Sequence, residues 1–167
     1  SITALLPGQD LGVAGDLFVE EGIVIDKVEV QLTEGEAVIS EPIENFAVEG
    51  VTYVDGEFFQ TVNGLVRSPF SRSFDDVRVS VVLYGSSDEI IGGGYTYINF
   101  IPANDTTGAS TSTTSSGEVV RAEMYPIVSN LSLFSSENEP PPDSQPPVVV
   151  SQGFGQSEYQ SSFGLLV

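Results

Sequence analysis

The side chains that most often carry out enzyme chemistry are missing from this sequence. It contains no His and no Cys, which excludes Ser-His-Asp and Cys-His arrangements and removes the usual ligands of zinc and copper. A glycosidase-type pair of carboxylates stays open, because the chain has 24 acidic residues, but acids scattered along an acidic chain are typical of a solvated surface. We therefore predict a non-enzymatic protein with no cofactor and no metal site.

Two acceptor triplets for N-linked glycans are present, Asn104-Asp105-Thr106 and Asn130-Leu131-Ser132. Each stands beside the end of a predicted strand, so we expect Asn104 and Asn130 to be solvent-accessible glycosylation sites. The segment 106–116 consists mostly of Ser and Thr, a composition that suits O-linked sugars. Attached glycans are therefore a predicted feature of the molecule, and they are typical of an extracellular protein.

The tyrosines suggest a second kind of chemistry, because aromatic rings stack on sugars. A carbohydrate-binding surface would often include Trp, which this chain lacks, and Tyr on a strand is more often a half-buried packing residue. The carbohydrate-binding interpretation therefore stays as an alternative. The residues concerned are Tyr53, Tyr84, Tyr95, Tyr97, Tyr125 and Tyr159.

The formal net charge of −19, from 24 acids against five bases, narrows the choice of partners. Without a basic patch, the chain suits neither nucleic acid nor an anionic membrane surface. It has no apolar run of about 18 residues, so we expect no membrane span. The first residue is Ser, which we interpret as a mature chain whose signal segment was removed, or as a trimmed chain. We expect an extracellular or cell-surface protein.

The elements that must position these residues are strands. Val, Ile, Leu, Phe and Tyr dominate the 40% of hydrophobic residues, and windows with helical periodicity are hard to find. The clearest alternation is at residues 75–85, where Val77, Val79, Val81 and Leu83 share one face. Other predicted strands lie at residues 26–32, 44–54, 55–68, 90–101 and 119–134, with Gly50 and Gly92–Gly94 marking bulges or close backbone packing. Residues 102–118 are predicted to form a polar loop or an exposed edge strand.

Residues 62–98, "VNGLVRSPFSRSFDDVRVSVVLYGSSDEIIGGGYTYI", resemble the FxLYD domain family. Val81-Val82-Leu83-Tyr84-Gly85 stands at the family signature, with Val81 in place of the Phe and Gly85 in place of the Asp. The similarity covers roughly residues 48–133. It implies an immunoglobulin-like β-sandwich of a secreted or surface-anchored prokaryotic protein, and it implies no reaction.

The C-terminal end continues beyond what a small β-domain needs. Residues 139–147 are rich in Pro and are expected to be extended. Residues 148–167 are β-prone and long enough, at ~3.3 Å per residue, to reach a second copy of the protein. We predict that they form an intersubunit interface by adding a strand to the neighbour. The predicted interface residues are Val148, Val149, Val150, Phe154, Tyr159 and Phe163.

The predicted organisation has four parts: an N-terminal extension (1–25), an immunoglobulin-like β-sandwich (26–135), a Pro-rich linker (136–147) and a β-prone tail (148–167). From it we predict a structural subunit of an extracellular filament or surface assembly. Copies of the protein would join through a terminal extension, with the C-terminal tail favoured over the N-terminal one as the donor. The alternative is a monomeric cell-surface module that binds a ligand or carbohydrate.

Overall fold

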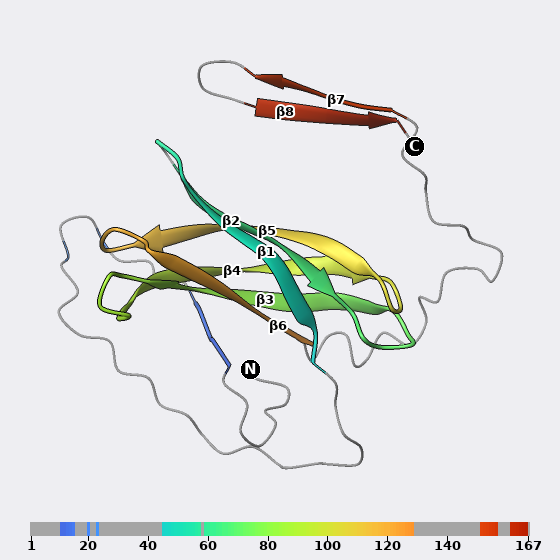
Figure 1. The fold of residues 1–167 in the computed structure, drawn as a ribbon, viewed down its shortest axis with the longest axis horizontal. Helices are drawn as coiled ribbons and strands as arrows, with labels where there is room; N and C mark the ends of the chain where they lie inside the picture. The colour runs from blue at the N-terminus through green and yellow to red at the C-terminus, as the bar shows by residue number, and fades with distance from the viewer. Residues whose placement is uncertain are drawn as a thin grey trace, which may run out of the picture. The chain divides into compact units, whose positions relative to one another are not determined.

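A computed structural model describes residues 11–15, 20, 23, 45–57 and 59–128, together with the backbone of residues 151–156 and 161–166 (Figure 1). These residues form strands and no helix, so the all-β class is confirmed. Accordingly, none of them belongs to a helix long and apolar enough to cross a membrane. The chain divides into two units, Ser1–Ser136 and Glu137–Val167.

The described residues of the first unit form one antiparallel sheet of six strands. The strands follow one another in the sheet in the order β1-β2-β5-β4-β3-β6. Their bounds are β1 Ala47–Asp55, β2 Gln60–Arg67, β3 Phe74–Tyr84, β4 Ile90–Ile101, β5 Thr106–Ser115 and β6 Arg121–Val128.

The sheet curls into a half-barrel, and Figure 1 shows β1 and β2 crossing over β3 and β4. The edge strands β1 and β6 consequently lie within contact distance of each other, although they do not form a hydrogen-bonded ladder. Between β4 and β5 the ladder has only two pairs, Gly92↔Ser115 and Gly93↔Thr114. The described strands thus form one curled sheet and do not show the two separate sheets of a sandwich.

The core lies on the concave side of this sheet and confirms the predicted register of β3. Val77, Val79, Val81 and Leu83 are all fully buried there, as expected for the alternate residues of a strand with one face on the core. Strands β1, β2 and β5 form one half of the sheet, and β4, β3 and β6 form the other. The first half contributes Val62, Val66 and Ala109 to the core, and β6 adds Met124 to the residues of β3. The two halves therefore share one core.

The Ser- and Thr-rich segment is a central strand, and its prediction as a loop or edge strand was wrong. β5 lies between β2 and β4 and buries every second residue, Ala109, Thr111 and Thr113. The Thr111 hydroxyl donates to the backbone carbonyl of Tyr95 at 2.9 Å, and a Thr with a satisfied hydroxyl suits a half-buried pleat nearly as well as Val does. The Thr113 hydroxyl is buried without a hydrogen-bond partner, which is a cost that the packing of the strand offsets.

Glycine positions control the irregularities of the sheet. Gly50 has a φ of 63° and lies where the β1–β2 register shifts between Glu49 and Thr52, so the predicted bulge is confirmed. The predicted close backbone packing at Gly92–Gly94 is also confirmed. A Cβ atom on Gly92 would lie 2.0 Å from the Thr114 carbonyl oxygen, and one on Gly94 would lie 2.4 Å from that of Ser112. Only glycine lets β4 approach β5 this closely.

The second unit contains a two-stranded antiparallel hairpin, formed by β7 (Ser151–Gln156) and β8 (Ser161–Leu166). Its register places Phe154 opposite Phe163 and Gly153 opposite Gly164. A hairpin of two strands is marginally stable by itself in water. Among the described residues each strand of this sheet has one hydrogen-bonded neighbour.

Several predicted features lie outside the described residues. They are the strand at 26–32, Asn130, the linker at 136–147, Val148–Val150 and Tyr159.

Replacing Gly92 by Ala should destabilise the protein, because the new Cβ would collide with the backbone of β5 at the point where the sheet curls. We expect Gly92→Ala to lower the free energy of unfolding by roughly 1–3 kcal/mol or more, measured by urea denaturation. The matched control is Gly108→Ala in β5, where an added Cβ meets nothing within 4 Å. Equal effects of the two substitutions would contradict this account of the curl.

Candidate interaction surface

The convex side of strands β4, β3 and β6 carries a connected set of polar and aromatic side chains, here called the outer face. Its residues alternate with the buried core residues of β3, and the strand register places their neighbours on β4 and β6. The set comprises Arg78, Ser80, Val82 and Tyr84 of β3, Gly93, Tyr95 and Tyr97 of β4, and Arg121, Glu123, Tyr125 and Ile127 of β6.

Residues 11–15, Leu-Gly-Val-Ala-Gly, lie on this outer face and are called the N-terminal segment. Gly12 is so close to Tyr125 that a Cβ on Gly12 would lie 2.2 Å from Cδ2 of the ring, and 2.8 Å from Cγ2 of Val82. The Ala14 side chain faces Gly93, with Cβ 3.4 Å from the position of a Cβ there. The Arg78 guanidinium donates a hydrogen bond of 2.6 Å to the Ala14 carbonyl oxygen.

This contact coincides with unusual burial on the convex side. Val82 is 5% exposed and Ser80 is 3% exposed, although both point away from the core. Burying a Val side chain contributes roughly 1.5–3 kcal/mol, so a cover over Val82 stabilises the fold. The Val82 methyl group against Gly12 is part of that cover.

Arg78 is held in place by two tyrosines. Its guanidinium carbon lies 4.2 Å from the ring centroid of Tyr95 and 5.9 Å from that of Tyr97, and Nη1 donates to the Tyr97 hydroxyl at 3.4 Å. The two rings meet edge to face. Cation–π contacts of this kind orient a guanidinium without requiring an acidic partner, so Arg78 keeps donors for the backbone carbonyl of Ala14.

Tyr125, the ring under Gly12, is fixed by a second network. Its hydroxyl donates to the Glu123 carboxylate and lies 3.3 Å from the Tyr84 hydroxyl, which itself donates to Glu123 at 3.1 Å. Arg121 pairs with Glu123 and Asp88 and lies 3.7 Å above the Tyr84 ring. The Tyr125 ring is therefore anchored through its hydroxyl.

The protonation states of this network follow from these hydrogen bonds. The hydrogen bond from Tyr125 is the main cause that lowers the pKa of Glu123, against a smaller opposing effect of burial. Burial, followed by the hydrogen bond to Glu123, raises the pKa of Tyr125. Glu123 thus stays ionised as an acceptor and Tyr125 stays neutral as a donor across the physiological range. A carboxylate with a lowered pKa accepts hydrogen bonds and is poorly suited to donate a proton as a general acid.

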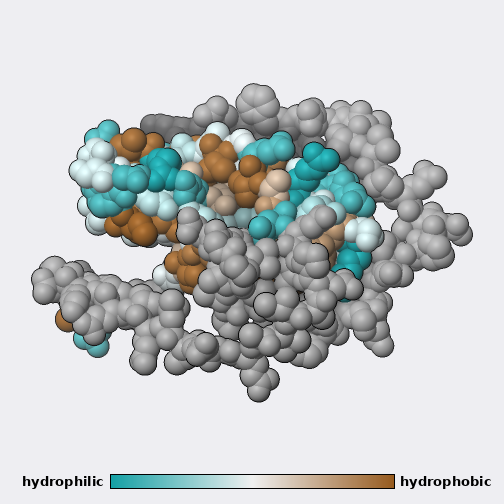
Figure 2. Space-filling model, turned by 60° about the horizontal axis from the view of Figure 1, so that its bottom comes forward, coloured by the Kyte–Doolittle hydropathy of each residue, from teal (hydrophilic) through white to brown (hydrophobic). Residues whose placement is uncertain are grey.

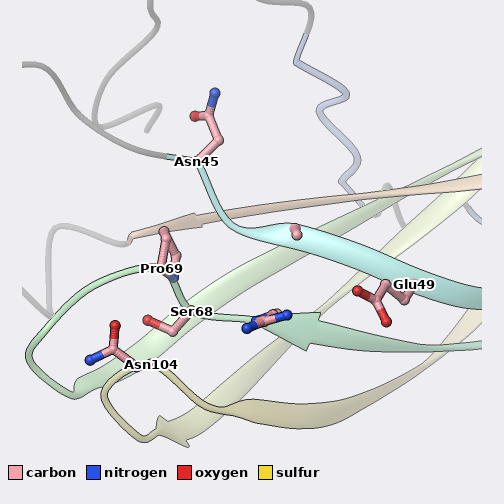
Figure 3. Close-up of a pocket in the computed structure, with 7 residues that line it drawn as sticks. Asn45, Glu49, Ser68, Pro69 and Asn104 are labelled. Atoms are coloured by element: carbon pink, nitrogen blue, oxygen red, sulfur yellow. The ribbon is translucent and has the colours of Figure 1, made fainter.

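A separate open hollow of about 440 Å³ lies at the end of β1 and β2. Figure 3 shows Asn104 and Ser68 at one end of it and Glu49 at the other. Asn104 is exposed, has a φ of 53°, and donates its backbone N–H to the Phe70 carbonyl at 2.8 Å. The predicted acceptor Asn104 therefore stands in a fixed turn with its side chain open to solvent.

The most exposed apolar side chains are those of Phe59, Ile90 and Val120, which are 65–73% exposed. Ile90 lies opposite Tyr84 in the register of β3 and β4. Figure 2 shows hydrophobic residues in small groups among hydrophilic ones over the described part of one side of the molecule. No group of three or more potential metal-binding side chains occurs within the described ranges.

Sequence reasoning identified the outer-face tyrosines singly and missed their arrangement. It treated residues 11–15 only as part of an irregular extension. The one local signal was Val82, an apolar residue among the polar alternate residues of β3, and it does not by itself indicate what covers it. Of the predicted intersubunit residues, only Phe154 and Phe163 lie on described backbone, and they face each other in the hairpin register.

Comparison of the chain with protein-family models, with curated proteins and with solved structures finds no match.

Replacing Glu123 by Gln should reduce the pH dependence of stability on the acidic side. A lowered folded-state pKa contributes stability that is present above the unfolded value of 4.5 and is lost as the pH falls through the folded value. We expect the free energy of unfolding of wild type to exceed that of Glu123→Gln by up to about 1 kcal/mol at pH 7, after discounting for solvent exposure. This difference should shrink toward pH 3.

The measurement is urea denaturation between pH 3 and pH 7. Glu118→Gln serves as the control, because it removes the same charge from an exposed residue between β5 and β6. If the difference in free energy of unfolding between wild type and Glu123→Gln does not change with pH, the role given to this carboxylate is wrong.

Proposed function

We propose that this protein is a non-enzymatic structural subunit of an extracellular filament or surface assembly, whose copies join through a terminal extension. The observation that supports it most is the N-terminal segment on the outer face, held by the Arg78–Ala14 hydrogen bond. An extension that a β-domain binds on its own surface can make the same contact with a neighbouring copy. Contacts of this kind that do not close on themselves produce open fibres.

The fold and family assignments belong to the same proposal. The two halves of the curled sheet enclose one core, as the two sheets of an immunoglobulin-like sandwich do, and this supports an immunoglobulin-like module over residues 26–135. Support for the FxLYD resemblance comes from Val81 and Leu83, which are buried, and from Tyr84, which closes β3 in the polar network. An extracellular location fits both the resemblance and the acceptor triplets.

Self-association of the full chain tests this function. We expect the mass measured by light scattering to rise with protein concentration, and negative-stain microscopy to show linked particles. A chain lacking residues 140–167 tests the C-terminal tail as donor, since loss of assembly would assign the joint to the β7–β8 unit. A full chain that stays monomeric at millimolar concentration would overturn the structural role.

The alternative function is a monomeric surface module that binds a ligand or carbohydrate. Tyr97, 41% exposed and in edge contact with Tyr95, is the observation that favours it, because exposed rings stack on sugars. A monomeric full chain that binds an oligosaccharide and loses this binding in Tyr97→Ala would establish it.

Glycosylation is proposed at Asn104, whose side chain is exposed, and at Asn130. Protein from its native source should then exceed the mass of the bare chain, as measured by intact mass spectrometry. Asn104→Gln should remove one glycan mass. A native mass equal to that of the bare chain would end this part of the proposal.

A further inference from the structure

We propose that the outer face is a docking site for the N-terminal segment of a second copy of this chain, so that residues 11–15 are exchanged between neighbours. This inference rests on the proposed structural role and gives it a donor and an acceptor surface. The occupant is specified by what the surface already binds, the sequence Leu-Gly-Val-Ala-Gly.

The docking site selects its occupant by shape. Gly12 lies against Tyr125 and Val82 at a separation that leaves no room for a side chain. Because Tyr125 is hydrogen-bonded to Glu123 and lies beside the Tyr84 hydroxyl, its ring cannot move aside freely. A peptide must therefore present glycine at this point.

A polar contact sets the register of the occupant. The Arg78 guanidinium donates to the backbone carbonyl of Ala14, two residues beyond Gly12, and the small Ala14 side chain fits over Gly93. Glycine against Tyr125 and a small residue against Gly93 fix the segment at two points. This combination accounts for specificity without any acidic or basic side chain on the occupant.

The docking site is formed by contacts within the sheet itself. Arg78 is oriented by Tyr95 and Tyr97, and Tyr125 by the network around Glu123. None of these contacts requires residues 11–15, so the site keeps its shape when its own segment leaves. A preformed site reduces the ordering cost of binding an incoming segment.

The connection between the segment and the sheet permits exchange. Residues 16–25, which precede the proposed module at 26–135, provide ten residues that span at most ~35 Å when fully extended, whereas a domain of this size has a radius of gyration of roughly 12 Å. The segment can therefore reach the outer face of a neighbour. Exchange conserves the contacts that Gly12 and Ala14 make with the outer face, so it is favoured once the concentration of copies approaches the effective concentration of the tethered segment, about millimolar.

The test is complementation between two full-length variants. Gly12→Val disables the segment and leaves the docking site intact, whereas Val82→Asp places a charge in the docking site and leaves the segment intact. Each variant alone should associate about tenfold or more weakly than wild type, a change of roughly 1.4 kcal/mol. An equimolar mixture, with one variant isotope-labelled, should form heterodimers that native mass spectrometry detects.

Gly15→Val is the matched control, because an added Cβ at Gly15 meets nothing within 4 Å, and it should associate as wild type does. Arg78→Ala provides a second docking-site variant in case Val82→Asp does not fold, and circular dichroism checks all variants. If wild type assembles and Gly12→Val assembles equally well, this inference is wrong, and the copies associate through another part of the chain. If wild type is monomeric up to millimolar concentration, both fail.

Discussion

The close approach of β4 to β5 at Gly92–Gly94 is the constraint on which the rest of the molecule depends. These two strands share only two ladder pairs, and glycine is the residue that lets their backbones meet there without steric overlap. The approach turns a six-stranded sheet through a sharp curl. It places β2 opposite β3, brings β1 near β6, and divides the side chains of β3 into an enclosed set and a convex set.

This curl makes the outer face available as a surface in its own right. Val77, Val79, Val81 and Leu83 take up the concave side, so that the alternate residues of β3 lie on the convex side. A convex sheet face in contact with solvent is usually polar. In this chain Val82 and Gly93 lie at the centre of the outer face, with Arg78 and the tyrosines around them, and the N-terminal segment covers them.

The sequence predicted the fold where one physical signal dominated. The alternation in β3 was unambiguous, because four apolar residues at a spacing of two allow only one buried face. The bulge at Gly50 was predictable because a glycine inside a strand often marks a bulge. β5 was missed because Thr111 and Thr113 are polar by composition. The burial of Thr111 depends on a hydrogen bond to the Tyr95 carbonyl that only the folded sheet provides, and Thr113 is buried without a partner for its hydroxyl.

The candidate surface was less predictable than the fold, since it joins residues distant in the chain. Nothing local to Gly12 indicates Tyr125 or Val82 as its neighbours, and nothing local to Arg78 indicates the carbonyl of Ala14. A single sequence contains the alternation of each strand but does not contain the order in which strands assemble. The curled topology decides which tyrosines form one network.

The few basic residues of this acidic chain have a consequence for its response to salt. Arg72 and Arg78 each lie over an aromatic ring, so much of what they contribute comes from short-range contact with π-electrons. Dissolved ions screen exposed charges over distances of about 10 Å at 0.1 M and act far less on partners in contact. Added salt therefore weakens the mutual repulsion of 24 acids while these contacts persist, and a concentrated brine favours the folded chain over pure water.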